Sequence, residues 1–142
     1  MTATGLQEVY VADLMAIDPI TIHPDASVED AGRLLRTYRI TGLPVVDDEG
    51  RPVGVISQTD LLTLETASLS SAIRHRPSGV RVGEVMTFPA ITIAMGAPIG
   101  AAARLMTEHS VHRLVAIDSA GRAVGVLSAT DLVAVVAETI SD

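Results

Sequence analysis

The chain has 142 residues, of which 48% are hydrophobic, and a formal net charge of −7; this length holds one compact domain or two half-domains that share a core. The acidic balance argues against a protein that covers nucleic-acid phosphates with a basic face. The chain has no cysteine, which excludes disulfides and thiolate chemistry, and neither a membrane-spanning apolar run nor a signal peptide is visible, so we expect a cytoplasmic protein.

The same pattern of residues occurs twice. Shifting the sequence by 71 positions aligns residues 11–62 with 82–133 without a gap, and 20 of the 52 aligned positions are identical. Unrelated sequences share far fewer, so the chain contains an internal duplication. We place the first repeat with its N-terminal lead-in at 1–64, a helix extension and linker at 65–81, and the second repeat at 82–142.

Each repeat begins with the β-branched run ITI, at 20–22 and 91–93, which predicts a short strand. A helix is predicted next: Ser27 is placed to cap it in the first repeat, with Asp30 three residues later as in a capping box. In the second repeat Pro98 suits the first helical turn. Apolar residues at helical spacing support both helices, namely Val28, Ala31, Leu34, Leu35 and Tyr38 in the first and Ile99, Ala102, Leu105, Met106 and His109 in the second.

A hairpin and a second helix complete each repeat. The acidic, glycine-containing turns DDEGR and DSAGR separate short apolar runs. The predicted strand pairs are 43–46 with 53–56 and 114–117 with 124–127. Thr59 and Thr130 stand where an N-cap belongs, each before an Asp and an apolar run that predict the second helix. In the first repeat this helix is predicted to extend toward Ile73, because Pro77 and Gly79 come only later.

The order in each repeat is therefore strand, helix, strand, strand, helix. One such unit cannot bury both faces of a three-stranded sheet, so we expect the two copies to pack sheet to sheet about a pseudo-twofold axis. The predicted fold class is α+β, with two β-α-β-β-α repeats.

The motif GVISQTDLL at 54–62 is repeated as GVLSATDLV at 125–133. A strand that ends at a serine and a helix that starts near a threonine bring hydroxyls and backbone N–H groups to a positive helix end, which favours an anion such as phosphate. Asp60 and Asp131 stand beside these groups, and a carboxylate can accept hydrogen bonds from two ribose hydroxyls. The same residues also make good helix caps, and the glycines can serve packing alone, so the phrase by itself leaves both interpretations open.

The two copies resemble a tandem pair of cystathionine-β-synthase (CBS) domains, a Bateman module. The resemblance rests on the lead-ins VADLM and VGEVM, on the full motif at 20–62, and on HRLVAIDSAGRAVGVLSATDLV in the second copy. It implies that the repeated phrase holds the phosphate and ribose of adenosine-containing ligands, through Ser57, Thr59 and Asp60 and through Ser128, Thr130 and Asp131.

The resemblance also implies a role for the basic pair His112 and Arg113, which replaces Thr41 and Gly42 of the first copy. The pair would reach the phosphate near the Asp60 of the other copy, so the two pockets would differ in affinity. The adenine would lie among aliphatic side chains, since the chain is poor in aromatic residues. The expected lining is Ile22, Ile40, Leu43 and Pro44 in one copy and Ile93, Val111 and Leu114 in the other.

We therefore expect a stand-alone regulatory module that binds AMP, ADP, ATP, NAD or S-adenosylmethionine and signals to an effector protein. It would need no metal or other cofactor and would not be an enzyme, because no metal-ligand spacing and no pairing of nucleophile and base is visible. CBS pairs commonly form dimers through their helices, and the small residues of GAAARLM at 100–106 suit a homodimer. The alternative is a homodimeric interaction scaffold whose nucleotide pockets are vestigial.

Overall fold

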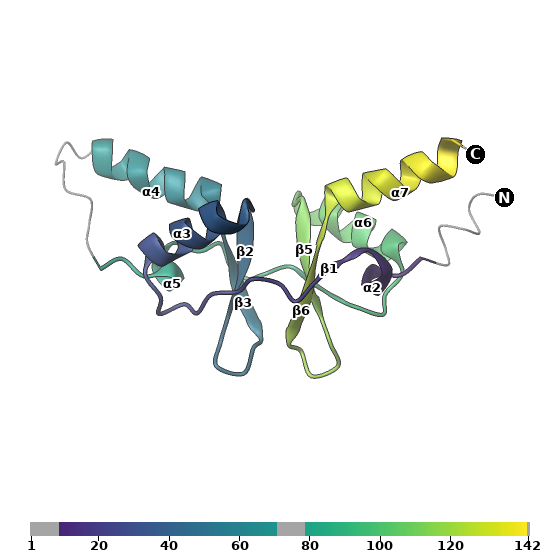
Figure 1. Ribbon diagram of the computed structural model, residues 1–142, viewed down its shortest axis with the longest axis horizontal. Coiled ribbons are helices and arrows are strands. Elements are labelled where there is room, and N and C mark those ends of the chain that lie inside the picture. The colour runs from purple at the N-terminus through teal and green to yellow at the C-terminus, as the bar shows by residue number, and fades with distance from the viewer. Residues whose placement is uncertain (1–8, 71–78, 142) are drawn as a thin grey trace. The chain divides into compact units, whose positions relative to one another are not determined.

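The computed structural model describes residues 9–70 and 79–141 (Figure 1). The chain divides into two compact units. The first-repeat unit is Ile20–Ala90, and the second-repeat unit joins Ile91–Asp142 with Met1–Pro19. The predicted helix end near Ile73 and the linker residues 71–78 lie outside the described residues.

In the first-repeat unit, helices α3 (Val28–Tyr38) and α4 (Gln58–Ser70) accompany an antiparallel hairpin (Figure 1). Its strands are β2 (Gly42–Val46) and β3 (Pro52–Ser57), paired from Gly42 opposite Ser57 onward, with a bulge near Val46. The short helix α5 (Val82–Val85) also belongs to this unit. The core lies between the strands and helices and consists of Ile22, Ala31, Leu35, Leu43, Val45, Ile56 and Val82.

The second-repeat unit repeats this arrangement around a four-stranded sheet of order β1-β6-β5-β4. β4 pairs with β5 in parallel, and the other two pairings are antiparallel. Nine buried side chains form its core, among them Val11, Ile93, Leu114 and Leu127. The elements are α2 (Val11–Leu14), β1 (Ala16–Ile17), β4 (Thr92–Ala94), α6 (Ile99–His109), β5 (Arg113–Ile117), β6 (Ala123–Ser128) and α7 (Ala129–Ser141).

The α+β class, both hairpins and the first helix of each repeat are confirmed. Ser27 caps α3 as predicted, because its side chain accepts a hydrogen bond from the backbone N–H of Asp30 at 3.0 Å. Pro98 was expected inside the first turn of α6 but is the N-cap residue before it. The predicted strand at 20–22 is wrong as a strand: Ile22 makes a single parallel bridge to Val45, whereas β4 forms in the second repeat.

The lead-in segments are exchanged between the repeats. The lead-in of the first repeat joins the second-repeat unit, where Val11 is fully buried and its N–H donates to the carbonyl of Ala97 at 2.8 Å. Val82, at the equivalent position in the lead-in of the second repeat, is fully buried in the first-repeat unit, and its N–H donates to the carbonyl of Ala26 at 2.8 Å. The compact units are thus offset from the repeat boundaries expected from the sequence.

A glycine in each hairpin permits the lead-in to approach. A Cβ added at Gly54 would lie 2.8 Å from the carbonyl oxygen of Thr87 and 2.7 Å from the sulfur of Met86. A Cβ at Gly125 would lie 2.5 Å from the sulfur of Met15. Within each unit, the segment that approaches the glycine is the lead-in.

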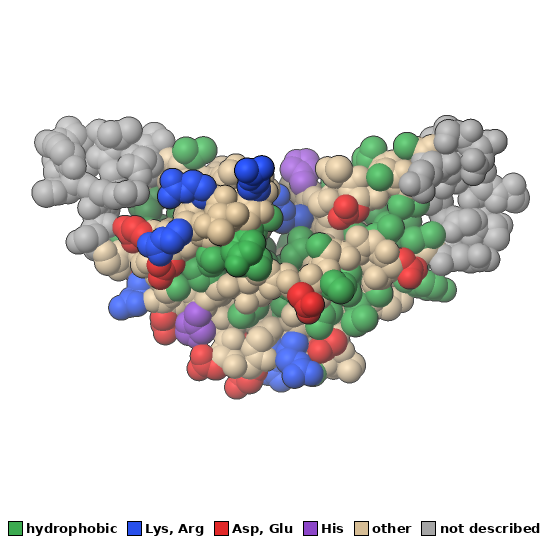
Figure 2. All heavy atoms as spheres, viewed as in Figure 1, with side chains coloured by type: hydrophobic (Ala, Val, Ile, Leu, Met, Phe, Trp, Pro, Cys, Tyr) green, Lys and Arg blue, Asp and Glu red, His purple; other side chains and the backbone are tan. Residues whose placement is uncertain are grey.

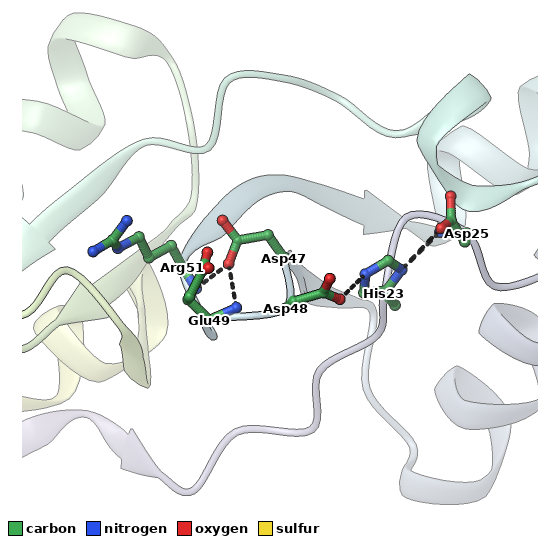
Figure 3. A network of polar contacts seen from close by, with 6 residues as sticks. All are labelled: His23, Asp25, Asp47, Asp48, Glu49 and Arg51. Carbon is green, nitrogen blue, oxygen red and sulfur yellow. Dashed lines mark hydrogen bonds and ion pairs between the residues drawn. The ribbon is translucent and has the colours of Figure 1, made fainter.

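The hairpin turns are organised by their first aspartate. Asp47 accepts hydrogen bonds from the N–H groups of Glu49 and Arg51, each at 2.9 Å (Figure 3). Asp118 does the same in the second repeat, and the N–H of Arg122, with that of Ala120, lowers its pKa below the ordinary 3.8. In the first repeat the next residue of the turn also contacts His23, whose Nε2 lies 2.8 Å from Asp48 (Figure 3).

Replacing Gly54 with alanine should force the lead-in away from β3, because the carbonyl of Thr87 is backbone and cannot swing aside. Overpacking of this kind costs about 1–3 kcal/mol of unfolding free energy, measurable by urea denaturation. Gly100→Ala is the matched control, since a Cβ there meets nothing within 4 Å and alanine favours a helix interior. An unchanged stability of Gly54→Ala would contradict the close approach.

Candidate functional site

The junction between β3 and α4 is organised by Ser57 and Asp60. Ser57 ends the strand, and its N–H donates to Oδ2 of Asp60 at 2.9 Å while its hydroxyl lies 3.1 Å from the same oxygen. In return, Oγ of Ser57 accepts the N–H of Asp60 at 3.2 Å. This is a capping box, in which each side chain satisfies a backbone N–H at the helix start.

The second repeat has the same junction between β6 and α7. The N–H of Ser128 donates to Oδ2 of Asp131 at 3.0 Å, and the N–H of Asp131 donates to Oγ of Ser128 at 3.2 Å. All four side chains are half-buried. The repeated phrase is therefore, first of all, a device that ends a strand and starts a helix.

The predicted capping roles of Thr59 and Thr130 are wrong. Helix α4 begins at Gln58 and α7 at Ala129, so each threonine lies one residue inside the helix and is exposed. The serine two positions earlier is the cap. The threonine hydroxyls remain close to the helix start, where unpaired N–H groups and the helix dipole favour an anion.

A third side chain reaches Asp60 from the lead-in. Thr87 forms two backbone hydrogen bonds with Val55, each of 2.9 Å, and its hydroxyl donates to Oδ1 of Asp60 at 3.0 Å. Sequence reasoning did not identify Thr87, and the signal that could have found it is its place directly after the lead-in VGEVM. The equivalent residue of the second-repeat unit is Ala16, which pairs with Val126 in the same register and has no hydroxyl.

Within the second-repeat unit the basic pair lies beside the capping box. Arg113 begins β5 directly opposite Ser128 in the strand ladder. The carbonyl of His112 accepts the N–H of Ala129, the first residue of α7, at 2.8 Å. His112, Arg113, Ser128 and Asp131 are thus neighbours in one repeat. The contribution of the basic pair to the Asp60 pocket stays a prediction.

Equivalent grooves run between the two helices of each unit. The groove between α3 and α4 has a volume of about 770 Å³ and is lined by Arg36, Arg39, Thr41 and Gln58 together with apolar residues. Figure 2 shows the basic side chains gathered around α3. The groove between α6 and α7 has about 550 Å³, and Thr107 and Ser110 replace the two arginines. The repeats therefore share a shape but differ in charge.

The predicted adenine lining differs in exposure from residue to residue. Leu43 and Leu114 are each 1% exposed, and Ile22 and Ile93 are also buried, all four in the cores of their own units. Their contact with a base stays a prediction. Pro44 is buried within β2. Ile40 and Val111 are half-buried and line the grooves, so they remain the accessible members of the predicted set.

Within residues 9–70 and 79–141, no three side chains of His, Asp or Glu gather closely enough to hold a metal ion. In the same ranges, none of the helices is both long and apolar enough to cross a membrane.

Comparison with known families agrees with the repeated architecture. The model of the CBS domain matches residues 11–66 and again 82–138. These two matches cover most of the chain, and the protein belongs to the CBS domain family as a tandem pair.

Curated relatives include longer proteins. The chain is 35% identical over 120 residues to inosine-5'-monophosphate dehydrogenase of Mycobacterium leprae, a match that covers 84% of this chain and 21% of that protein. It is 31% identical over 133 residues to the chloroplastic CBS domain-containing protein CBSX2 of Arabidopsis thaliana, covering 79% of this chain and 56% of that protein. The chain thus spans about a fifth of the dehydrogenase and about half of CBSX2.

Solved structures with the same fold carry adenosine compounds. CBSX2 in complex with AMP superposes with a TM-score of 0.76 at 34% identity, covering 91% of this chain and 96% of that one. The CBS pair of protein MJ0100 in complex with 5'-methylthioadenosine and S-adenosyl-L-methionine superposes with a TM-score of 0.76 at 25% identity, covering 92% and 97%.

The corrected cap assignment predicts different costs for two neighbouring hydroxyls. Ser128→Ala should lower the unfolding free energy by about 0.5–2 kcal/mol, the usual cost of losing an N-cap. Thr130→Ala should change it by less than about 0.5 kcal/mol, because an exposed residue one position inside the helix does not cap it. Urea denaturation of both variants measures the difference. A larger loss of unfolding free energy for Thr130→Ala than for Ser128→Ala would show that the threonine is the cap.

Proposed function

We propose that this CBS pair is a regulatory module that binds an adenosine-containing ligand at the strand-to-helix junctions of its repeats. The observation that carries the proposal is the likeness to CBSX2 in complex with AMP, which extends over nearly the whole of both chains. The junction chemistry of Ser57, Asp60, Ser128 and Asp131 supports it.

The junction offers the two kinds of group that a nucleotide needs. Asp60 and Asp131 each place a carboxylate in the first turn of a long helix, where it can accept hydrogen bonds from ribose hydroxyls. The start of the helix, with Thr59 or Thr130 beside it, favours the phosphate. AMP, ADP, ATP, NAD and S-adenosylmethionine all present this adenosyl group, and the relatives' ligands belong to the same class.

The ligand would act through binding rather than chemistry. A ligand that binds one conformation of the module more tightly than another shifts their populations by its differential affinity. An effector protein that prefers the same conformation then binds more tightly when the ligand is present, and the coupling is reciprocal. This is how a module without a reaction of its own can regulate a partner.

A homodimer is the partner that the surface favours. Leu62 on α4 and Val133 on α7 occupy equivalent positions and are 66% and 65% exposed. Val136 adds a third exposed apolar side chain on α7. A second copy that covered these three side chains would remove their apolar surface from water. The alternative function, a homodimeric scaffold with vestigial pockets, rests on the same faces.

AMP at millimolar concentration should raise the melting temperature by about 5 °C, because a ligand that binds only the native state stabilises it by mass action. Asp60→Asn and Asp131→Asn should each remove part of the rise while preserving a helix cap. Differential scanning fluorimetry measures the shift, and Glu108→Gln on the exposed face of α6 is the control. No shift with AMP, ADP, ATP, NAD or S-adenosylmethionine, with a dimer still present in sizing, would favour the scaffold instead.

Arg113→Ala tests the phosphate assignment. The substitution should weaken the binding of AMP by about tenfold and the binding of adenosine by less than about twofold. The reason is that a guanidinium binds phosphate oxygens in a bidentate manner and does not contact the nucleoside. Isothermal titration measures both ligands, and Arg104→Ala, another arginine of the second repeat, is the control. Equal losses for AMP and adenosine would show that Arg113 does not bind the phosphate.

A further inference from the structure

We propose that Thr87 makes the two ribose sites chemically different, so that the Asp60 site tolerates the loss of one ribose hydroxyl and the Asp131 site does not. The inference rests on the proposed function and concerns the selectivity of the same sites. It follows from counting the hydrogen-bond acceptors that each carboxylate has left.

Donors of its own compact unit occupy most of the acceptor positions of Asp60. A carboxylate offers about four lone-pair positions. The N–H and the hydroxyl of Ser57 donate to Oδ2, at 2.9 and 3.1 Å, and the hydroxyl of Thr87 donates to Oδ1 at 3.0 Å. About one acceptor position therefore remains, on Oδ1.

The carboxylate of Asp131 accepts fewer hydrogen bonds than that of Asp60. Within the described residues, the donor on its side chain is the N–H of Ser128, at 3.0 Å from Oδ2. About three acceptor positions remain, including both on Oδ1. Two donors make the difference. The hydroxyl of Ser57 occupies a position on Oδ2 of Asp60, and the hydroxyl of Thr87 occupies one on Oδ1. The second donor is absent from the other unit because Ala16 pairs with Val126 where Thr87 pairs with Val55, so the backbone is equivalent and the hydroxyl is missing.

The two neighbouring hydroxyls of a ribose need two hydrogen-bond acceptors if both are to donate. At Asp131 both ribose hydroxyls can donate to the carboxylate. At Asp60 one hydroxyl donates to Oδ1, and the other meets the neutral oxygen of Thr87 or water. Hydrogen bonds to an ionised acceptor are roughly twice as strong as those between neutral groups. The second ribose hydroxyl therefore contributes less to the binding affinity at Asp60 than at Asp131.

The experiment titrates the full chain with AMP, 2'-deoxy-AMP and 3'-deoxy-AMP by calorimetry. Asp131→Asn isolates the Asp60 site, and Asp60→Asn isolates the Asp131 site. Each asparagine keeps a side-chain oxygen for the N–H of the capping serine, which is unchanged. At the isolated Asp131 site both deoxynucleotides should bind about tenfold more weakly than AMP. At the isolated Asp60 site one of them should bind within about threefold of AMP.

Changing the lead-in residue should exchange these patterns. With the Asp60 site isolated, Thr87→Val removes the hydroxyl at constant shape, and both deoxynucleotides should then bind about tenfold more weakly than AMP. Thr87→Ser keeps the hydroxyl, so one deoxynucleotide should still bind within about threefold of AMP. With the Asp131 site isolated, Ala16→Ser should introduce the tolerance. A role of Thr87 in stability alone would change all three affinities together.

Two results would overturn the inference, and they are distinguishable. If AMP binds but both sites reject the two deoxynucleotides equally, or Thr87→Val leaves the pattern unchanged, Thr87 does not set the selectivity and the proposed function stands. If AMP does not bind the unmodified chain at all, the proposed function and this inference fail together.

Discussion

A serine and an aspartate three residues apart hold each repeat together at the point where its hairpin becomes a helix. Each side chain accepts the backbone N–H of the other residue, at 2.9 and 3.2 Å for Ser57 and Asp60 and at 3.0 and 3.2 Å for Ser128 and Asp131. These contacts end the strand, satisfy N–H groups at the helix start and fix a carboxylate at the positive end of the helix dipole. A ribose bound there, as proposed, would share acceptors already used by the fold, so stability and ligand selectivity would depend on the same atoms.

Both repeats keep this junction of serine and aspartate, but the side chains around it differ between them. Equivalent backbone registers carry Thr87 in one repeat and Ala16 in the other. Equivalent grooves carry Arg36 and Arg39 in one repeat and polar, uncharged side chains in the other. Differences of this kind allow two copies of one fold to hold ligands of different affinity or kind, without any change in the elements that position them.

The sequence predicts the regular parts of this structure well. Alternating apolar runs around a glycine-containing turn specify the hairpins, and helical spacing after Ser27 specifies α3, because each signal is local. The cap of the second helix was misassigned since SQTD offers both Ser57 and Thr59 in front of Asp60. Spacing alone does not say where the helix begins. The strand at 20–22 failed for a similar reason, because residue pattern does not report which backbone groups pair.

Long-range features were beyond the sequence. Nothing in VADLM or VGEVM states which repeat the segment packs against, so the exchange of lead-ins and the contact of Thr87 with Asp60 appear only in the fold. The burial of Leu43 and Leu114 in the cores of their units depends on which face of each hairpin the helices cover, and a local pattern does not specify that face.

A crystal structure of the protein grown with AMP tests the central claim most directly. The account predicts ribose oxygens within about 3.2 Å of the carboxylate of Asp60 or Asp131, with the capping hydrogen bonds of Ser57 and Ser128 intact. AMP bound away from both junctions, or a carboxylate that leaves its serine to reach the ribose, would contradict it.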